Sequence, residues 1–392
     1  MPTVDASVMR SANKRTVLSL LYQKQTLSRA EISRVTGLNR ATVSSLVDEL
    51  IAEEFVEETG VGTSSGGRKP ILLQFKVDTG FVIGIDVQIT HLTTVLINAA
   101  RQILYERRRN LLSEEQPVDA EALTQMLVEE IYLAKRACPP SPHGLMGVGI
   151  GLPGMVNHEQ GRALYLPNMG IVNWLVRDAL QHHLALPVFV DNDANCGAWA
   201  QYLATRLPNL VFINAGIGLG VGLIMHGQLY RGTHGIAGEA GHHTIRAAED
   251  RCSCGNLGCW EQYSSENGLA RALARQGVAV PWPLPADFVS QTVAAAETGS
   301  AAHRRAFQEL AEALGVGLVN ILNIFNPTAT YLGGTLAEAH EWILPEAHAV
   351  IAERALMANR QMTVTPVPNN TVALGAAGLA LAQSIDLLPA QI

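Results

Sequence analysis

The sequence predicts an α/β protein of two lobes with a cleft between them, preceded by a small winged helix–turn–helix module. Two observations carry this prediction. Near the N-terminus, two short helical patterns are joined by a turn that contains glycine, and two short strand patterns follow. Further along, strand patterns come first and then alternate with helical ones, which is typical of α/β proteins whose lobes enclose a ligand.

Size and composition fit a globular protein with sizeable cores. A chain of 392 residues is long enough for two or three domains, and 48% hydrophobic with 16% charged residues is ordinary for such proteins. The sequence has no run of 18 apolar residues, and its N-terminus lacks the apolar core of a signal peptide. We therefore expect a soluble, cytoplasmic protein that does not enter a membrane.

The charge distribution restricts any DNA contact to the N-terminal part. A net charge of −7 argues against a chain that binds nucleic acid along its whole length. The first 80 residues carry ten Lys and Arg against nine Asp and Glu, whereas the whole chain carries 28 against 35. Only this N-terminal part is expected to approach DNA phosphates.

The first 52 residues show the pattern of three helices. Apolar positions within residues 8–23 predict a buried helix. Ser28 and Glu31 have the spacing of a capping box, which predicts a second helix that ends at Gly37, and Ile32 and Val35 should face inward. Asn39 can cap a third helix, whose apolar residues recur at the spacing of one buried face: Val43, Leu46, Val47, Leu50 and Ile51.

The N-terminal end of this third helix is the candidate for contact with a major groove, because polar residues gather there: Arg40, Thr42, Ser44 and Ser45. The alternative is an ordinary helical hairpin. Strand patterns at 55–58 and 70–75 argue against that alternative, because the loop between them is rich in Gly and Ser and ends in Arg68 and Lys69. Such a loop is typical of a wing that lies on phosphates or enters a minor groove.

The remainder of the chain alternates between strand and helix patterns. Three strands within residues 81–109 predict an antiparallel meander, because alternating apolar residues are separated by turn signals at short spacing. Further elements are expected, in chain order, at 120–137 (helix), 145–150, 187–190 and 211–214 (strands), 311–325 (helix), 331–334 (strand) and 374–383 (helix).

A compact group of metal-ligand residues lies in the middle of the chain. Cys252, Cys254 and Cys259 fall within eight residues, and His242 and His243 precede them by about ten. Thiolate and imidazole are the ligands that Zn²⁺ prefers, so we expect one structural zinc ion per chain. The alternative, three reduced cysteines without a metal, is weaker because clustered cysteines beside a histidine in a cytosolic chain are typical of metal binding.

Several short motifs lie along the same chain: GIGLPGMV at 149–156, PN at 167–168, DNDAN at 191–195, GEAGH at 238–242, CSCGNLGCWE at 252–261, NP at 326–327 and LGG at 332–334. Through these motifs the chain resembles the ROK family (repressors, open reading frames and kinases) over essentially its whole length. The resemblance implies an actin-like, hexokinase-like pair of lobes. It also implies a winged helix–turn–helix DNA-binding domain at 1–78 and a ROK sugar-binding domain at 79–392, with a zinc-binding segment at 242–259.

The resemblance also implies roles for individual residues. The zinc ligands would be His242, Cys252, Cys254 and Cys259, with His243 as the alternative to His242. The sugar site would be formed by Gly154, Asn192, Asp193, Glu239, His242 and Glu261. These residue types suit a sugar, because a carboxylate accepts two hydroxyl hydrogen bonds and an Asn side chain both donates and accepts. In the family's kinases, the aspartate at position 193 is the general base that deprotonates the sugar hydroxyl.

The chain departs from the family's kinases at both phosphate-binding loops. The kinase pattern Asp-x-Gly-Gly-Thr falls on residues 86–90, where Gln88 and Ile89 replace the glycines. The kinase pattern Gly-Thr-Gly becomes Gly-Ile-Gly, with Ile217 in place of the threonine. A side chain at these positions obstructs the close backbone approach that a phosphate requires. Two such losses, with the sugar residues intact, favour a sensor that is not an enzyme.

The sequence thus predicts a sugar-responsive repressor of carbohydrate uptake and catabolism genes, which binds operator DNA as a homodimer or tetramer. Related regulators respond to glucose, xylose or N-acetylglucosamine, and all three fit a ring of Glu, His and Asn side chains. The alternative is a ROK-type, ATP-dependent sugar kinase that carries a DNA-binding domain. A third hypothesis is a regulator controlled by a protein partner, such as a component of sugar transport.

Overall fold

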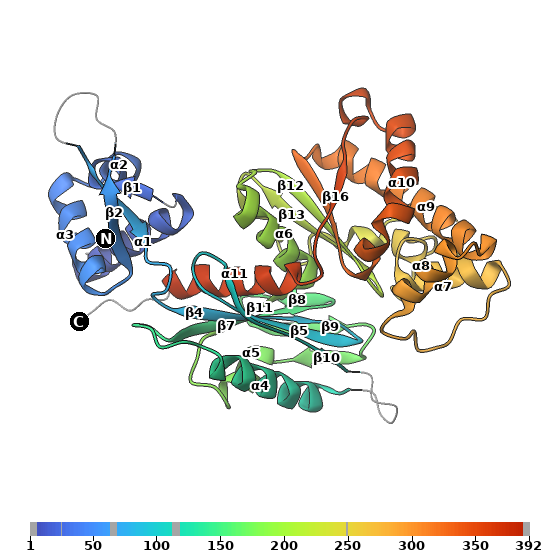
Figure 1. Cartoon of the computed structure of the whole chain (residues 1–392), viewed down its shortest axis with the longest axis horizontal. Coiled ribbons are helices and arrows are strands. Elements are labelled where there is room, and N and C mark those ends of the chain that lie inside the picture. The colour runs from blue at the N-terminus through green and yellow to red at the C-terminus, as the bar shows by residue number, and fades with distance from the viewer. Residues whose placement is uncertain (1–5, 25, 63–68, 112–117, 248–249, 387–392) are drawn as a thin grey trace.

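The chain folds into an N-terminal module followed by two lobes (Figure 1). The computed structural model describes residues 6–24, 26–62, 69–111, 118–247 and 250–386. The module consists of α1 (Ala6–Lys24), β1 (Thr26–Ser28), α2 (Arg29–Thr36), α3 (Arg40–Ala52), β2 (Val56–Val61) and β3 (Ile71–Phe75). Its strands form an antiparallel sheet in the order β1-β3-β2. The strand β1 was not predicted, because three residues are too few for a periodic signal.

The ends of α2 and α3 confirm the predicted caps. Ser28 and Glu31 form both hydrogen bonds of the capping box, and Gly37 ends α2 with φ = 73°, in the left-handed region that glycine favours. The side chain of Asn39 accepts a hydrogen bond from the N–H of Thr42 at the start of α3. The prediction that Val35 faces inward is wrong: it is 54% exposed, because this eight-residue helix buries only Ile32.

The first lobe is built on a five-stranded sheet in the order β11-β7-β4-β5-β6. Its strands are β4 (Phe81–Val87), β5 (His91–Ile97), β6 (Ile103–Asn110), β7 (Leu145–Leu152) and β11 (Val188–Asn192). The predicted meander is the antiparallel run β4-β5-β6. Helices α4 (Ala120–Arg136) and α5 (Val176–Gln181) cover one face (Figure 1). A small sheet of β8 (Met155–Asn157), β9 (Arg162–Leu166) and β10 (Ile171–Trp174), which was not predicted, follows β7.

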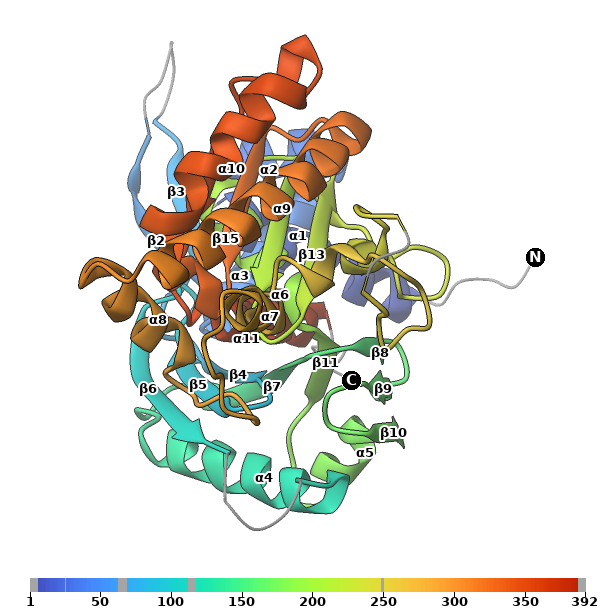
Figure 2. The ribbon, with the colours of Figure 1, turned by 90° about the vertical axis from the view of Figure 1, so that its right-hand side faces the viewer.

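The second lobe contains another five-stranded sheet, in the order β14-β13-β12-β15-β16. Its strands are β12 (Leu210–Ala215), β13 (Leu219–Met225), β14 (Gln228–Leu229), β15 (Ala329–Gly333) and β16 (Val364–Pro366). Helices α9 (Ala301–Phe325) and α10 (His340–Arg354) pack on its outer side, and α7 (Glu266–Arg275) and α8 (Phe288–Glu297) complete the lobe (Figure 2). The helix predicted at 311–325 begins earlier, at Ala301, because the buried positions of α9 continue through Ala306, Phe307 and Leu310.

Two helices cross between the lobes. Helix α6 (Asp193–Thr205) follows β11 of the first lobe but packs on β12 and β13 of the second. Helix α11 (Thr371–Asp386) follows the last strand of the second lobe but packs on β4 and β7 of the first. The two helices touch through their backbones, since a Cβ atom added to Gly375 would lie 1.7 Å from the carbonyl oxygen of Cys196. Each lobe is therefore anchored to the other by a closely packed helix.

The N-terminal module packs on the first lobe through α1 and α11 (Figure 1). One hydrophobic cluster contains residues of α1, α2 and α3, of the strands β4 and β5, and of α11, among them Leu18, Leu21, Leu381 and Ile385.

Among the described residues, no helix is both long enough and apolar enough to span a bilayer.

Candidate functional site

A cavity of about 390 Å³ lies between the two lobes. It is lined by the turn after β7, the junction of β11 and α6, the hairpin of β12 and β13, and the segment around the short 3₁₀-helix η1 (Glu239–His242). All six predicted sugar-site residues are among its lining residues: Gly154, Asn192, Asp193, Glu239, His242 and Glu261. Chain segments far apart in the sequence thus meet at one polar cavity.

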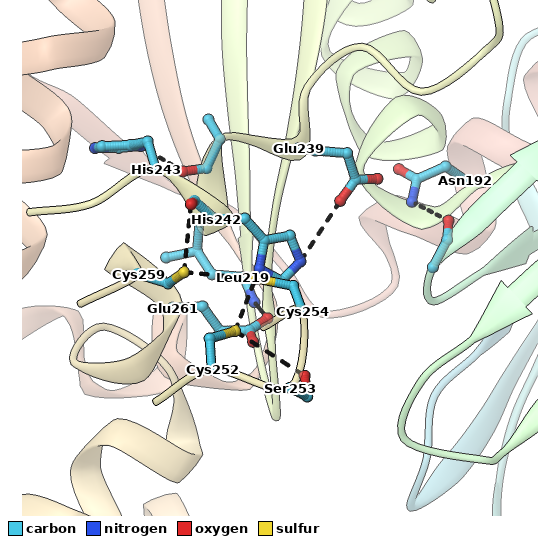
Figure 3. A network of polar contacts seen from close by, with 12 residues as sticks. Asn192, Leu219, Glu239, His242, His243, Cys252, Ser253, Cys254, Cys259 and Glu261 are labelled. Atoms are coloured by element: carbon cyan, nitrogen blue, oxygen red, sulfur yellow. Dashed lines mark hydrogen bonds and ion pairs between the residues drawn. The ribbon is translucent and has the colours of Figure 1, made fainter. Parts of the chain in front are cut away.

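Asn192 and Gly154 form one wall of the cavity. The Oδ1 of Asn192 accepts a hydrogen bond from the N–H of Asn195 and so caps α6, while its Nδ2 donates to the carbonyl oxygen of Gly154 at 3.0 Å (Figure 3). Gly154 has φ = 133°, and a Cβ atom there would lie 2.5 Å from the carbonyl oxygen of Tyr165, so only glycine fits. Asn192 therefore holds the turn of Gly154 in place.

Asp193 begins α6 on the cavity floor. Its Oδ1 accepts from the N–H of Ala194 and its Oδ2 from the Nδ2 of Asn214, both at 2.8 Å. Burial of the carboxyl raises its pKa to about 6, although both hydrogen bonds lower it. The carboxyl is therefore a preorganised acceptor that carries its charge at neutral pH.

Glu239 and Glu261 face the cavity from the second lobe (Figure 3). Burial raises the pKa of Glu239, as does Glu261, while His242 lowers it. The Oε2 of Glu239 lies 3.8 Å from the Nε2 of His242. Glu261 accepts a hydrogen bond from the N–H of Leu219 at 3.1 Å, which fixes this carboxylate against the β12–β13 hairpin.

Several other polar residues that line the cavity were not predicted as ligands. Asn214 lies one residue before the end of β12, and its Oδ1 is buried without a partner among the described residues, which leaves an acceptor at the cavity wall. Tyr165 and Asn168 line the wall that the first lobe forms. For Asn214, the sequence offered a usable signal, because a polar residue near the end of a buried strand is a candidate ligand residue. For Tyr165 it offered none, because its place at the cavity depends on the pairing of β9 with β8.

A cluster of possible metal ligands borders the cavity (Figure 3). The ligand atoms of His242, Cys252, Cys254 and Cys259 all lie within 4.8 Å of one another. The Nδ1 of His242 lies 3.5 Å from the sulfur of Cys252, and the sulfurs of Cys254 and Cys259 are 3.7 Å apart. The structure thus brings together the predicted set and directs the Nδ1 atom of His242 at the thiols.

The alternative ligand His243 points away from this cluster. Its Nδ1 contacts the carbonyl oxygen of Ala240, its Nε2 lies 3.2 Å from the amide of Asn320 on α9, and its ring lies against Trp260. The backbone extends after η1, so adjacent histidines face opposite sides. His242 is therefore the histidine of the cluster.

The chemistry of the four side chains fits a divalent cation. Burial and the adjacent thiols of Cys254 and Cys252 together raise the pKa of Cys259 to about 12, because thiolates crowded together repel one another. A cation bound among three sulfurs and one imidazole would remove this repulsion, and such a donor set is typical of closed, four-coordinate structural sites.

Gln88, Asn214 and Ile217 line both the large cavity and a second one of only about 20 Å³. The Nε2 of Gln88 donates to the Oδ1 of Asp86 at 2.7 Å. Burial and the charge of Asp193 together raise the pKa of Asp86 to about 8. A cavity of this size holds about one water molecule.

The predicted DNA-contact residues lie on the exposed side of α3. Arg40 and Ser45 are exposed, and Thr42 and Ser44 are half-buried. The guanidinium of Arg10 on α1, which was not predicted, donates to the Oγ of Ser45 at 2.9 Å and also pairs with Glu49. On the wing, Lys69 is exposed, and Arg68 lies outside the described residues.

A winged helix–turn–helix in front of two lobes that enclose a polar cavity defines a DNA-binding regulator with a ligand site. The ROK family profile matches residues 82–383, and a profile described as winged helix-turn-helix DNA-binding matches residues 10–57. The chain therefore belongs to the ROK family.

Relatives that match nearly the whole chain are named repressors. The xylose repressor of Caldicellulosiruptor bescii is 36% identical over 97% of this chain and 98% of its own length. The xylose repressor of Bacillus subtilis is 32% identical over 99% of this chain and 100% of its own length. A crystallised ROK family transcriptional regulator, a homologue of the E. coli MLC protein, is 26% identical with a TM-score of 0.78 over 97% of this chain and 98% of its own.

Proposed function

We propose that this protein is a sugar-responsive transcriptional repressor whose affinity for operator DNA is switched by a sugar bound between the lobes. The observation that carries the proposal is the polar cavity in a chain that also bears a winged helix–turn–helix. A ligand that contacts both lobes binds the closed arrangement better than the open one and shifts the population toward it. Such coupling usually changes affinity by a factor of about 5–150.

The proposed sugar ligands are Gly154, Asn192, Asp193, Glu239, His242 and Glu261. Carboxylates and amides at the cavity wall match the vicinal hydroxyl groups of a monosaccharide. Xylose is the first candidate, since two relatives that match nearly the whole chain are named xylose repressors. Asp193 would act there as a hydrogen-bond acceptor without abstracting a proton.

The proposed metal is one structural zinc ion per chain, held by His242, Cys252, Cys254 and Cys259. When bound, it would fix the loop that presents Glu261 and orient His242 beside Glu239. The Nε2 atom of His242 would remain on the cavity side, so the metal cluster would support the sugar site without taking part in chemistry.

The kinase alternative is disfavoured by the side chains of Gln88 and Ile217. The side chain of Gln88 is held by Asp86, and the space behind it is too small for a phosphate group. We expect no sugar-dependent release of ADP when the protein is incubated with ATP and D-xylose or D-glucose, measured in a coupled assay. ADP release that requires the sugar and disappears in Asp193→Asn would instead establish the kinase.

The proposed DNA-binding unit is residues 1–78, with α3 in a major groove and the wing on the flanking backbone. Arg40→Ala should weaken DNA binding and reduce the slope of log affinity against log salt by about one. Thr42 and Ser44 substitutions should alter sequence preference, which in vitro selection from a random duplex library measures.

The matched control is Arg136→Ala, which removes an exposed arginine at the end of α4 on the first lobe. It should leave both the affinity and the salt slope unchanged. A chain lacking residues 1–78 that still binds the selected duplex would refute the assignment. Because such modules recognise two half-sites through two-fold symmetry, we also propose a homodimer or a tetramer, which light scattering would detect.

A further inference from the structure

A histidine of the first lobe lies against the end of α3. His143, in the loop between α4 and β7, stacks on Phe55 with ring centroids 3.8 Å apart and an interplanar angle of 13°. Its Nε2 lies 2.9 Å from the carbonyl oxygen of Glu53, so Nε2 carries a proton and donates it. Glu53 is the C-cap residue of α3. His143 thus satisfies a carbonyl group that has no intrahelical partner at the end of that helix.

The linker between module and lobe belongs to the same junction. Thr79 is fully buried, and its Oγ1 donates to the carbonyl oxygen of Glu54 at 2.6 Å. The carbonyl oxygen of Thr79 accepts from the N–H of His143 at 2.9 Å, and the N–H of Phe81 donates to the carbonyl oxygen of Gly144 at 2.8 Å. The loop that carries His143 is therefore fixed to the linker by backbone hydrogen bonds.

The strand β7 connects this junction to the cavity. It begins at Leu145, two residues after His143, and ends at Leu152, directly before the turn of Pro153 and Gly154 that lines the cavity. It is hydrogen-bonded to β4 on one side and to β11 on the other. A strand held on both sides moves with its lobe as a rigid body, so the two ends of β7 move together.

The module is thus attached to the first lobe at two places. The helix α1 packs on α11, and at the C-terminal end of α3 His143 and Thr79 donate hydrogen bonds to the carbonyl oxygens of Glu53 and Glu54. Attachment through α1 alone would leave α3 free to reorient about that contact. We propose that His143 is a positioning residue for operator recognition: it fixes α3 on the first lobe, so that closure of the cavity displaces α3. This inference rests on the proposed function, because it concerns how a bound sugar alters DNA binding.

The test uses the full-length chain and three variants. His143→Ala removes both the ring and the donor, and His143→Phe keeps a ring on Phe55 without the donor. His182→Ala is the matched control, because His182 is an exposed histidine of the same lobe at the end of α5. The probes are D-xylose and a DNA duplex selected in vitro with the wild-type chain. Calorimetry measures xylose affinity, and fluorescence anisotropy measures duplex affinity with and without xylose.

The sugar response is the ratio of the duplex affinities without and with xylose. In His143→Ala this ratio should fall at least about fivefold toward one, while xylose affinity stays within about twofold of wild type. The ratio for His143→Phe should lie between those of wild type and His143→Ala, and the ratio for His182→Ala should match wild type. General destabilisation would not change the ratio selectively, so an unchanged ratio in His143→Ala overturns the inference.

Hydrogen exchange tests the contact without DNA or sugar. The amides of residues 50–56 should exchange faster in His143→Ala than in wild type, since the end of α3 loses its partner on the first lobe. Equal exchange rates overturn the inference. A wild-type chain that binds the duplex but responds to no sugar in a panel of pentoses and hexoses contradicts the proposed function instead.

Discussion

Cys259→Ser is expected to remove the bound metal and to lower both the stability and the sugar affinity of the protein. Cys259 is fully buried and directly precedes the 3₁₀-helix η2 (Trp260–Gln262), which carries Glu261. The binding energy of the metal contributes to folding, so loss of one ligand from a closed site should lower the free energy of unfolding by on the order of 3–5 kcal/mol. Because the released loop presents Glu261 and shares His242 with the cavity, sugar affinity should also fall about tenfold or more.

Three measurements check this expectation: metal content by mass spectrometry, thermal unfolding, and xylose affinity by calorimetry. Wild type should contain about one equivalent of zinc per chain, and the variant almost none. Cys138→Ser is the matched control, because Cys138 is a half-buried cysteine outside the cluster. A wild-type protein without zinc that gains no stability on reconstitution would contradict the proposed metal site.

Asp193→Asn and Glu239→Ala are expected to abolish the sugar response while leaving operator binding intact. Both oxygens of Asp193 accept hydrogen bonds, from Ala194 and from Asn214. An amide at this position would direct an NH₂ group at one of these donors, and the cavity floor would lose a charged acceptor. Loss of one charged hydrogen bond usually costs about 1.5–3 kcal/mol, so sugar affinity should fall about 10–150-fold.

The same two assays, calorimetry with sugar and anisotropy with the selected duplex, check this prediction. Both variants should bind the duplex as wild type does when sugar is absent, because neither residue lies in the N-terminal module. Glu159→Ala is the matched control, since Glu159 is an exposed glutamate of the first lobe. If either variant responds normally to a sugar that wild type binds, the effector site lies elsewhere.

The sequence by itself determined the elements whose signals are local. The capping residues Ser28, Glu31 and Asn39 located the starts of α2 and α3, because a cap acts within one turn of the helix. The cysteine cluster was evident because its three thiols lie within eight residues of the chain. The strands of the β4-β5-β6 meander were evident from alternation and turn signals, since each strand pairs with its neighbour in the chain.

The sequence was less informative where tertiary packing overrides a local pattern. Val35 has the spacing of an inward residue, yet it faces solvent because α2 is too short to bury a second position against α3. The start of α9 and the small sheet of β8, β9 and β10 were missed for a related reason. Short apolar runs do not distinguish helix from strand until their partners are known.

Only the tertiary structure decided how the functional residues meet. His242 and His243 are neighbours in the chain, and the backbone conformation after η1 directs one at the cysteines and the other at α9. The choice between them could not come from spacing, because both satisfy it. Likewise, the contact of His143 with α3 joins residues 90 positions apart. Such contacts depend on the packing of whole lobes and on the crossing of α6 and α11, for which a local sequence pattern carries no signal.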